Sequence, residues 1–541
     1  MILSLFDSLT LCLFDSLSLC LFDSLSLCLF DYKKTLPMVT THPIISSLKR
    51  LPHILLWSGF LTLYALCGCM NDDDYSMSAT DRLIPSVDTL SLDTIISAQP
   101  TNTYTFNVFN PSKKAIRLSR VYLENGSHSI FKVNVDGVFV EGGSVGAEAG
   151  IEVAAEDSLR VFVNATAPEQ DTDQPVSHED KLVFETEGGA SSGVVLSAYA
   201  QDVIPLGLHT LTADTLLAAR RPYIITDSLV VAEGATLTLA PGTRLYFHPE
   251  SQLIVRGRLV AEGTAEQKIT MRGDRLGYMF SNQPYDRIPN QWGGIVIASS
   301  SYGNRINHAD IHSGTFGIRC DSADTDREKL RLENSIVHNV SGDCLQATDC
   351  RLFVGNCQIT NAGGNCVTLV GGHHEFVHCT IANFYLFQGG RGVALAYTNS
   401  LGDVRHPLLK ASFTNCLITG YSDDEIMGQA SERYQDDAFE FEFVNCLLNT
   451  PEAEDERIRN CLWDNDKKPN EVWREDNFTP GFNLKTLEFP FTLNPKSQAV
   501  GQADYATTLA TYPRDLLGRD RRADGNSDIG CYEAQPEENE Q

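Results

Sequence analysis

The stretch NCQITNAGGNCVTLVGGHHEFVHCTI, residues 356–381, spans one full repeat and the start of the next, and this repeat decides the fold. Asn356-Cys357-Gln358-Ile359 returns 22 residues later as His378-Cys379-Thr380-Ile381. Four more segments align with these two: His308-Ala309-Asp310-Ile311, Asn334-Ser335-Ile336-Val337, Asn415-Cys416-Leu417-Ile418 and Asn445-Cys446-Leu447-Leu448. Each segment carries Asn or His, then a small residue, and an aliphatic residue two positions later.

The spacing within each segment predicts strands that stack into a solenoid. Residues two apart face the same side of a strand, so the small and aliphatic positions point together into one core. A period of just over 20 residues with Gly-rich corners is typical of a parallel β-solenoid, whose coils stack about 4.8 Å apart. Asn side chains at equivalent corners can then hydrogen-bond along the stack. A second strand per coil is indicated at 342–345 and 364–367.

Further stretches resemble right-handed parallel β-helix proteins of bacterial surfaces, which share the pectate-lyase-like architecture. They are GATLTLAPGTRLYF (234–247), LIVRGRLVAEGTAEQKITMRGDR (253–275) and QWGGIVI (291–297), and PRDLLGRDRRADGNSDIGCYE (513–533) is similar to the terminal segment of many such chains. The resemblance implies a right-handed parallel β-helix over residues 206–535, followed by an acidic tail at 536–541. The same architecture serves lyases, hydrolases and adhesins, so it does not choose a function.

Residues 83–205 show short alternating segments separated by turn sequences. Tyr104, Phe106 and Val108 alternate with polar residues, and Asn110-Pro111-Ser112 is a turn sequence. Seven or eight such strands over about 120 residues predict an immunoglobulin-like β-sandwich. The predicted fold class is therefore all-β, a sandwich followed by the β-helix. We expect the sandwich to be a spacer or docking module, because it shows no His/Asp/Ser constellation.

The N-terminal part contains signals for export. Residues 1–37 include an eight-residue repeat that is typical of translated simple DNA repeats. Residues 38–68 read as a lipoprotein signal peptide, because a basic flank precedes an uncharged run that ends in Leu66-Cys67-Gly68-Cys69 and resembles a bacterial lipobox. The resemblance implies lipid on Cys69 and an outer-membrane anchor, and the acidic linker over 69–82 favours the cell exterior. The alternatives are a plain signal peptide with an incidental Cys and an ordinary solvated linker.

The net charge argues against one class of partner, and the cysteine spacing predicts the state of the thiols. Seventy acidic residues against 42 basic ones give a net charge of −28, which argues against a nucleic-acid partner, because phosphate binding needs clustered Lys and Arg. The cysteines after Cys69 fall mainly in the repeat columns. We expect buried free thiols there, although a spacing of one coil also permits disulfides and an exported chain meets an oxidising compartment.

Two kinds of side-chain cluster could hold a metal ion. In His373-His374-Glu375-Phe376-Val377-His378, one strand would place His374 and His378 about 13 Å apart, too far to share a metal, so we expect His378 to serve in the Asn/His column. Asp321–Asp326 and Asp423-Asp424-Glu425 could bind calcium, but acidic loops are usually only solvated. No other cofactor is expected.

The residues that β-helix polysaccharide enzymes need are not recognisable in the sequence. Asp423-Asp424 has no matching Asn-Thr-Asp one coil earlier. Arg391, between two glycines, could act as a base or an anion clamp. It could equally be a turn residue that packs on a carboxylate.

Two long loops, 274–291 and 452–477, bring aromatic residues to one side of the repeat. Tyr285, Trp292, Trp463 and Trp473, in or beside them, could stack on sugar rings, or they could cover the core. We therefore expect a cell-surface lipoprotein whose β-helix binds an extracellular glycan or a host or cell-surface ligand without catalysis. A polysaccharide lyase or glycoside hydrolase, and a structural stalk or adhesin, are the alternatives.

Overall fold

The computed structural model describes residues 75–207, 209–280, 283–464, 473–523 and 525–535. Cys69, the signal peptide and the acidic tail lie outside the described residues. Strands dominate, and the one α-helix among the described residues is α3 (Tyr505–Thr511). Among the described residues, no helix is long and apolar enough to cross a membrane.

The N-terminal domain is a β-sandwich, as predicted. Its two sheets enclose a core that includes Leu92, Val121, Val161, Phe184 and Leu196. One sheet has the order β1 (Ile84–Pro85), β3 (Tyr104–Phe109), β9 (Ser158–Ala165), β5 (Phe131–Val135) and β6 (Val138–Phe139). The other has the order β2 (Thr89–Ile96), β11 (Ser191–Gln201), β10 (Val176–Thr186), β4 (Ile116–Leu123) and β7 (Ser144–Gly146), with β8 (Glu152–Val153) also paired to β4.

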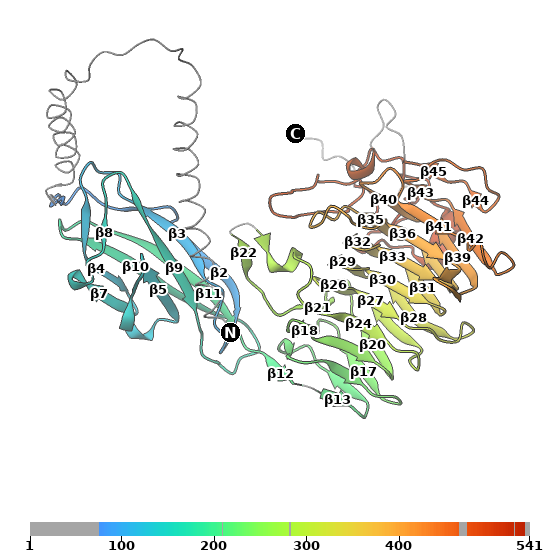
Figure 1. Ribbon diagram of the computed structural model, residues 1–541, viewed down its shortest axis with the longest axis horizontal. Coiled ribbons are helices and arrows are strands. Elements are labelled where there is room, and N and C mark those ends of the chain that lie inside the picture. The colour runs from blue at the N-terminus through green and yellow to red at the C-terminus, as the bar shows by residue number, and fades with distance from the viewer. Residues whose placement is uncertain (1–74, 208, 281–282, 465–472, 524, 536–541) are drawn as a thin grey trace, which may run out of the picture. The chain divides into compact units, whose positions relative to one another are not determined.

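The rest of the chain forms a right-handed parallel β-helix of three sheets, which run from β12 to β45 (Figure 1). Sheet I contains β12 (Ile204–Leu206), β15 (Tyr223–Ile225), β18 (Arg244–Phe247), β21 (Ile269–Gly273), β26 (Ala309–His312), β29 (Ile336–Val340), β32 (Gln358–Ala362), β35 (Thr380–Asn383), β40 (Leu417–Gly420), β43 (Leu447–Leu448) and β45 (Leu462–Trp463). The first strand begins two residues before the boundary expected from the sequence.

Sheets II and III complete each coil. Sheet II contains β13 (His209–Leu211), β16 (Leu229–Val231), β19 (Gln252–Val255), β24 (Gly294–Ile297), β27 (Ile318–Cys320), β30 (Leu345–Thr348), β33 (Val367–Val370), β36 (Leu395–Thr398) and β41 (Ile426–Gln429). Sheet III contains β14 (Thr215–Leu217), β17 (Thr236–Leu239), β20 (Arg258–Glu262), β25 (Asn304–Asn307), β28 (Glu328–Glu333), β31 (Arg351–Gly355), β34 (Gly372–Val377), β39 (Leu408–Thr414), β42 (Phe439–Val444) and β44 (Ile458–Arg459).

The columns predicted from the repeat line the core. Cys357, Cys379, Cys416 and Cys446 are fully buried free thiols in successive coils. The backbone N–H of Cys379 donates to Sγ of Cys416 at 3.5 Å, and that of Cys416 donates to Sγ of Cys446 at 3.4 Å. The thiols therefore follow one another along the helix axis and act as small apolar groups.

The Asn/His column forms the corner before sheet I. Each of its members adopts a left-handed conformation, with φ of 48° at Asn334, 52° at Asn356 and 52° at His378. Asn tolerates this conformation better than most residues, which explains its recurrence there. Asn356 Nδ2 donates to Asn334 Oδ1 at 2.8 Å, and Asn415 Nδ2 lies 3.0 Å from His378 Nε2. The predicted ladder role of His378 is confirmed.

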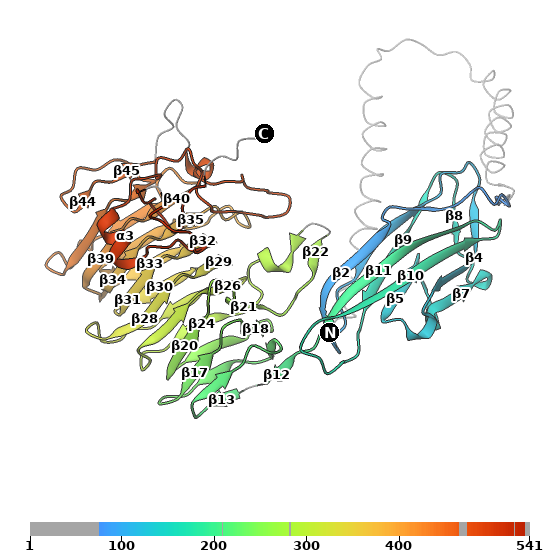
Figure 2. The ribbon, with the colours of Figure 1, turned by 180° about the vertical axis from the view of Figure 1, so that it is seen from behind.

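The C-terminal end corrects one prediction. The helix was expected to continue to residue 535, but its last sheet strand among the described residues is β45, and residues 473–523 and 525–535 form a strap instead. The strap runs back over the outer face of sheet I, where Cys531 N donates to Thr380 Oγ1 at 3.1 Å and Tyr532 Oη to Gln358 Oε1 at 2.6 Å. Figure 2 shows this red segment, with α3, against the orange coils. Its apolar residues pack on Ala382 and Leu417.

Candidate functional site

A row of aromatic and charged side chains lies on the outer face of sheet I. Strand pairing places Tyr246 of β18 beside Arg272 of β21, and His312 of β26 beside His338 of β29. Asp310 points to the same face as His312, because the two are two residues apart on β26. One flank of this row is the inserted loop 274–291, which contains β22 (Tyr278–Phe280), β23 (Gln283–Pro284) and the short helix η6 (Tyr285–Arg287).

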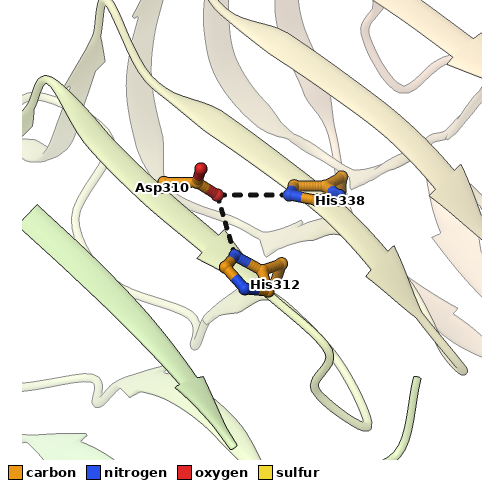
Figure 3. Close-up of side chains that lie close together, drawn as sticks. All are labelled: Asp310, His312 and His338. Atoms are coloured by element: carbon orange, nitrogen blue, oxygen red, sulfur yellow. Dashed lines mark hydrogen bonds and ion pairs between the residues drawn. The ribbon is translucent and has the colours of Figure 1, made fainter. Parts of the chain in front are cut away.

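His312 belongs to a connected network, and Figure 3 shows it together with His338 and the Asp310 carboxylate that contacts both rings. The Nδ1 of His312 lies 2.8 Å from Asp310 Oδ1, and its Nε2 lies 2.9 Å from Asp286 Oδ1, from the loop. His338 Nε2 lies 3.1 Å from the same Asp310 oxygen. Arg272 forms an ion pair with Asp286. Two carboxylates thus bracket one nearly buried imidazole.

The network fixes the charge state of its members. Burial lowers the pKa of His312, but Asp310 and Asp286 outweigh burial and raise it to about 9. Burial raises the pKa of both carboxyls, but His312 outweighs it and holds the pKa of each below its usual range. At neutral pH His312 is therefore a cation and both carboxylates are ionised. Neither carboxyl is poised to donate a proton as a general acid.

A groove begins at His338 and has a volume of about 420 Å³. Its floor is polar, with Asn339, Gln358 and Asn361 from β29 and β32. The strap forms its wall with Glu488, the half-buried ring of Phe489 and neighbouring residues. Arg287 also lines the groove, and its Nη2 donates to Glu488 Oε1 at 2.8 Å. The groove therefore combines amide groups, an ion pair and an aromatic ring.

A larger hollow of about 670 Å³ lies in the sandwich domain. Its lining includes Lys132, Glu141 and Phe139, whose side chain is 66% exposed, together with several glycines. No cluster of titratable side chains is described among its lining residues. We therefore regard the sheet I groove as the stronger candidate.

Arg391 occupies a corner beside β36. Its Nη2 donates to Glu425 Oε1 at 3.2 Å, and its Nη1 donates to Ser422 Oγ at 3.1 Å. Glu425 is fully buried, and burial raises its pKa to about 7 against the opposing charge of Arg391. This is the packed-turn arrangement given above as the alternative to a base or anion clamp.

The four predicted aromatic residues are mostly packing groups. Trp292 is 1% exposed and stacks on Phe247 in the core at 4.3 Å between ring centroids, so it offers no face to a ligand. Tyr285 is buried beside Arg275. Trp463 packs against the core. The Nε1 of Trp473 donates a hydrogen bond of 2.8 Å to the backbone oxygen of Asp464.

The histidine run divides between two faces of its strand, and each acidic run has a residue paired with an arginine. His374 points into the core, where its Nε2 donates to Gly371 O at 2.7 Å, whereas His373 is on the outer face. In the acidic runs, Asp321 pairs with Arg319 at 3.4 Å and Asp423 pairs with Arg474. Calcium binding by these runs stays a prediction. Within the described part of the chain, one group of three, Asp310, His312 and His338, could hold a metal ion.

The sequence reasoning missed this group, although a signal was present. His312 follows the aliphatic residue Ile311, and His338 follows Val337, the next aliphatic residue of the same column. Extending the repeat alignment by one position would have placed the two imidazoles in adjacent coils. Asp286 gave no such signal, because it lies in an insertion that does not repeat.

Comparison with known proteins finds weak structural similarities. No family model matches the chain, and no curated protein matches it. A solved structure of the catalytic unit of a thermostable GH87 alpha-1,3-glucanase from Streptomyces thermodiastaticus is similar over 66% of this chain and 75% of its own, at 12% identity and a TM-score of 0.27. A GH87 alpha-1,3-glucanase catalytic domain in complex with nigerose is similar over 68% and 88%, at 10% identity and a TM-score of 0.17.

One further similarity concerns another domain type. A PapD-like domain of human CEP192 is similar over 31% of this chain and 99% of its own, at 9% identity and a TM-score of 0.16. All three TM-scores are below 0.5, so no function is taken from these structures.

Proposed function

We propose that the protein binds an extracellular polysaccharide in the sheet I groove. The observation that carries this proposal is the lining: Asn339, Gln358 and Asn361 lie along the floor, and the half-buried Phe489 ring stands in the wall. The Gln358 amide is already hydrogen-bonded to Tyr532 and Thr360, which holds it in place, and the Asn361 oxygen accepts from the backbone N–H of Phe384. Amide groups match sugar hydroxyls because both donate and accept hydrogen bonds, and an aromatic ring can pack on the apolar face of a pyranose. Successive coils, spaced about 4.8 Å apart, repeat similar groups in a line, which suits a linear polymer.

Binding without cleavage is favoured over hydrolysis by the charge state of the neighbouring carboxyls. A glycoside hydrolase needs one carboxyl that keeps its proton near neutral pH. The pKa values of Asp286 and Asp310 are both held below the usual range. A lyase or a hydrolase would instead create new unsaturated or reducing chain ends.

A panel of polyuronates and neutral glucans tests the proposal, read both for binding and for new reducing or unsaturated ends. Phe489→Ala should weaken binding about 10- to 100-fold, because burying an aromatic ring contributes about 1.5–3 kcal/mol. Phe139→Ala, which removes an exposed ring from the sandwich hollow, is the matched control and should bind normally. No binding by any glycan, or equal losses in the two variants, refutes the proposal, and new chain ends would make the protein an enzyme.

We also propose that lipid on Cys69 holds the protein in the outer membrane with its β-helix at the cell exterior. The lipobox-like sequence and the acidic linker support this proposal. Cys69→Ala should release the protein into the soluble fraction, and protease added to intact cells should cut the wild-type protein. A Cys69→Ala variant that stays in the membrane fraction would contradict the anchor.

A further inference from the structure

We propose that Asp310, His312 and His338 form a binding site for a divalent transition-metal ion. One atom from each residue, a carboxylate oxygen and two imidazole nitrogens, lies within 4.8 Å of the others. The three side chains come from two adjacent strands, β26 and β29, whose hydrogen bonds fix their backbone positions. Zn²⁺ is bound in proteins by this mixture of imidazole and carboxylate ligands.

The geometry around the three groups is already close to that of a coordination shell. Asp310 Oδ1 lies 2.8 Å from His312 Nδ1 and 3.1 Å from His338 Nε2. Ligand atoms at about 2.0–2.2 Å from a tetrahedral ion are separated by roughly these distances or slightly more. The two rings lie 4.8 Å apart between centroids at an angle of 33°, so both nitrogens can face the same carboxylate (Figure 3). A small movement of the side chains, with release of the proton that His312 Nδ1 shares with Asp310, would admit the ion.

The second nitrogen of His312 provides an independent argument. A histidine that binds a metal through one nitrogen usually donates its other N–H to a carboxylate, which orients the ring. His312 Nε2 has such a partner, Asp286 Oδ1, at 2.9 Å. Asp286 is held in turn by Arg272, and its backbone oxygen accepts a hydrogen bond from Ser313 Oγ at 2.7 Å. The orienting shell that such a site needs is therefore built into the loop.

The three ligands leave at least one coordination position open. Three protein ligands plus an open position are characteristic of sites at which the metal also contacts a ligand or water. His338 lines the polar groove, so a metal bound to it would lie beside that groove. The proposed metal site does not depend on what the groove binds, and the titration therefore uses the ion alone.

Calorimetric titration of the chelator-treated full chain with Zn²⁺ tests the site. We expect one tight equivalent, and Co²⁺ in its place should give the visible absorption of a tetrahedral ion. His338→Gln keeps an N–H donor for Asp310 and should weaken binding at least about 100-fold, since loss of an orienting partner alone costs about 10- to 100-fold. Asp286→Asn, which keeps all three ligands, should weaken it about 10- to 100-fold.

His373→Ala is the matched control. His373 also pairs with a carboxylate, Glu375, at 3.1 Å, but it lies outside the cluster. The His373→Ala variant should bind Zn²⁺ with the affinity of the wild-type chain. The proposal is overturned by the absence of a tight equivalent in the wild-type chain, or by unchanged affinity in His338→Gln. If His338→Gln does not fold, Asp286→Asn decides, and unchanged affinity there overturns the proposal.

Discussion

Arg521 is the residue on which docking of the strap depends most directly. Its guanidinium is fully buried. It donates to Glu533 Oε1 at 2.7 Å, to Asp528 O at 3.2 Å, and to Asn356 Oδ1 and Gly530 O at 3.0 Å each. Arg521→Met keeps most of the side-chain volume but leaves these acceptors without their donor. The change therefore isolates the polar contribution of the guanidinium.

The magnitude follows from the burial of the pair. Removing one partner of a buried ion pair costs about 3–5 kcal/mol, because the other charge stays in the interior without compensation. A loss of this size shifts the equilibrium between docked and undocked strap by roughly 10²- to 10⁴-fold. Burial raises the pKa of Glu533 to about 7 against the opposing charge of Arg521. The variant should therefore be less destabilised at pH 6, where Glu533 can take up a proton, than at pH 8.

Alkylation of Cys531 measures the docking. This thiol belongs to the strap and is fully buried against sheet I in the wild-type protein, so it should react slowly. Arg521→Met should accelerate its modification, followed by mass spectrometry, and should lower the free energy of unfolding in urea. Arg522→Met is the matched control, since Arg522 pairs with Asp520 at the surface and such pairs contribute about 0–1 kcal/mol. Equal modification rates in Arg521→Met and the wild-type protein would refute the role given to the strap.

Three further predictions concern the β-helix itself. His374 is buried as the neutral form, and burial lowers its pKa to about 4 from 6.5, so the unfolded chain takes up the proton first. The wild-type protein should lose about 3 kcal/mol of unfolding free energy as pH falls from 6.5 to 4. In urea titrations, His374→Leu should reduce this dependence of stability on pH. An unchanged dependence would exclude His374 as its cause. Trp292→Ala should cost about 3–5 kcal/mol without selectively weakening glycan binding, and a fully stable variant would contradict its place in the core. Asn334→Ala should be less stable than Asn334→Gly by about 1 kcal/mol, because φ is 48° there; the reverse order would argue against a strained corner.

The repeating part of the fold was predictable from the sequence because every coil imposes the same constraint. Cys357, Cys379 and Cys416 occupy one column, and strands that alternate inward and outward leave little choice for the residues between them. The corners were predictable for the same reason, because Asn recurs where the backbone is left-handed. Periodicity therefore fixed the core and the direction of each side chain in the strands.

The strap and the site depend on contacts that periodicity does not encode. Arg521 resembles an ordinary surface arginine in the sequence, and its burial requires acceptors from Asn356 and Glu533, which are far apart along the chain. Trp292 was open to two interpretations because a loop aromatic can face either the core or the solvent. Asp286 reaches His312 only through the path of an inserted loop. Such positions become visible only when the coils have been stacked.

A crystal structure with the tightest-binding oligosaccharide of the panel tests the central claim most directly. The account predicts sugar density over the outer face of β29 and β32, in contact with Gln358 and Asn361 and with a pyranose ring against Phe489. Density in the sandwich hollow beside Phe139, or an empty groove at saturating oligosaccharide, would contradict it.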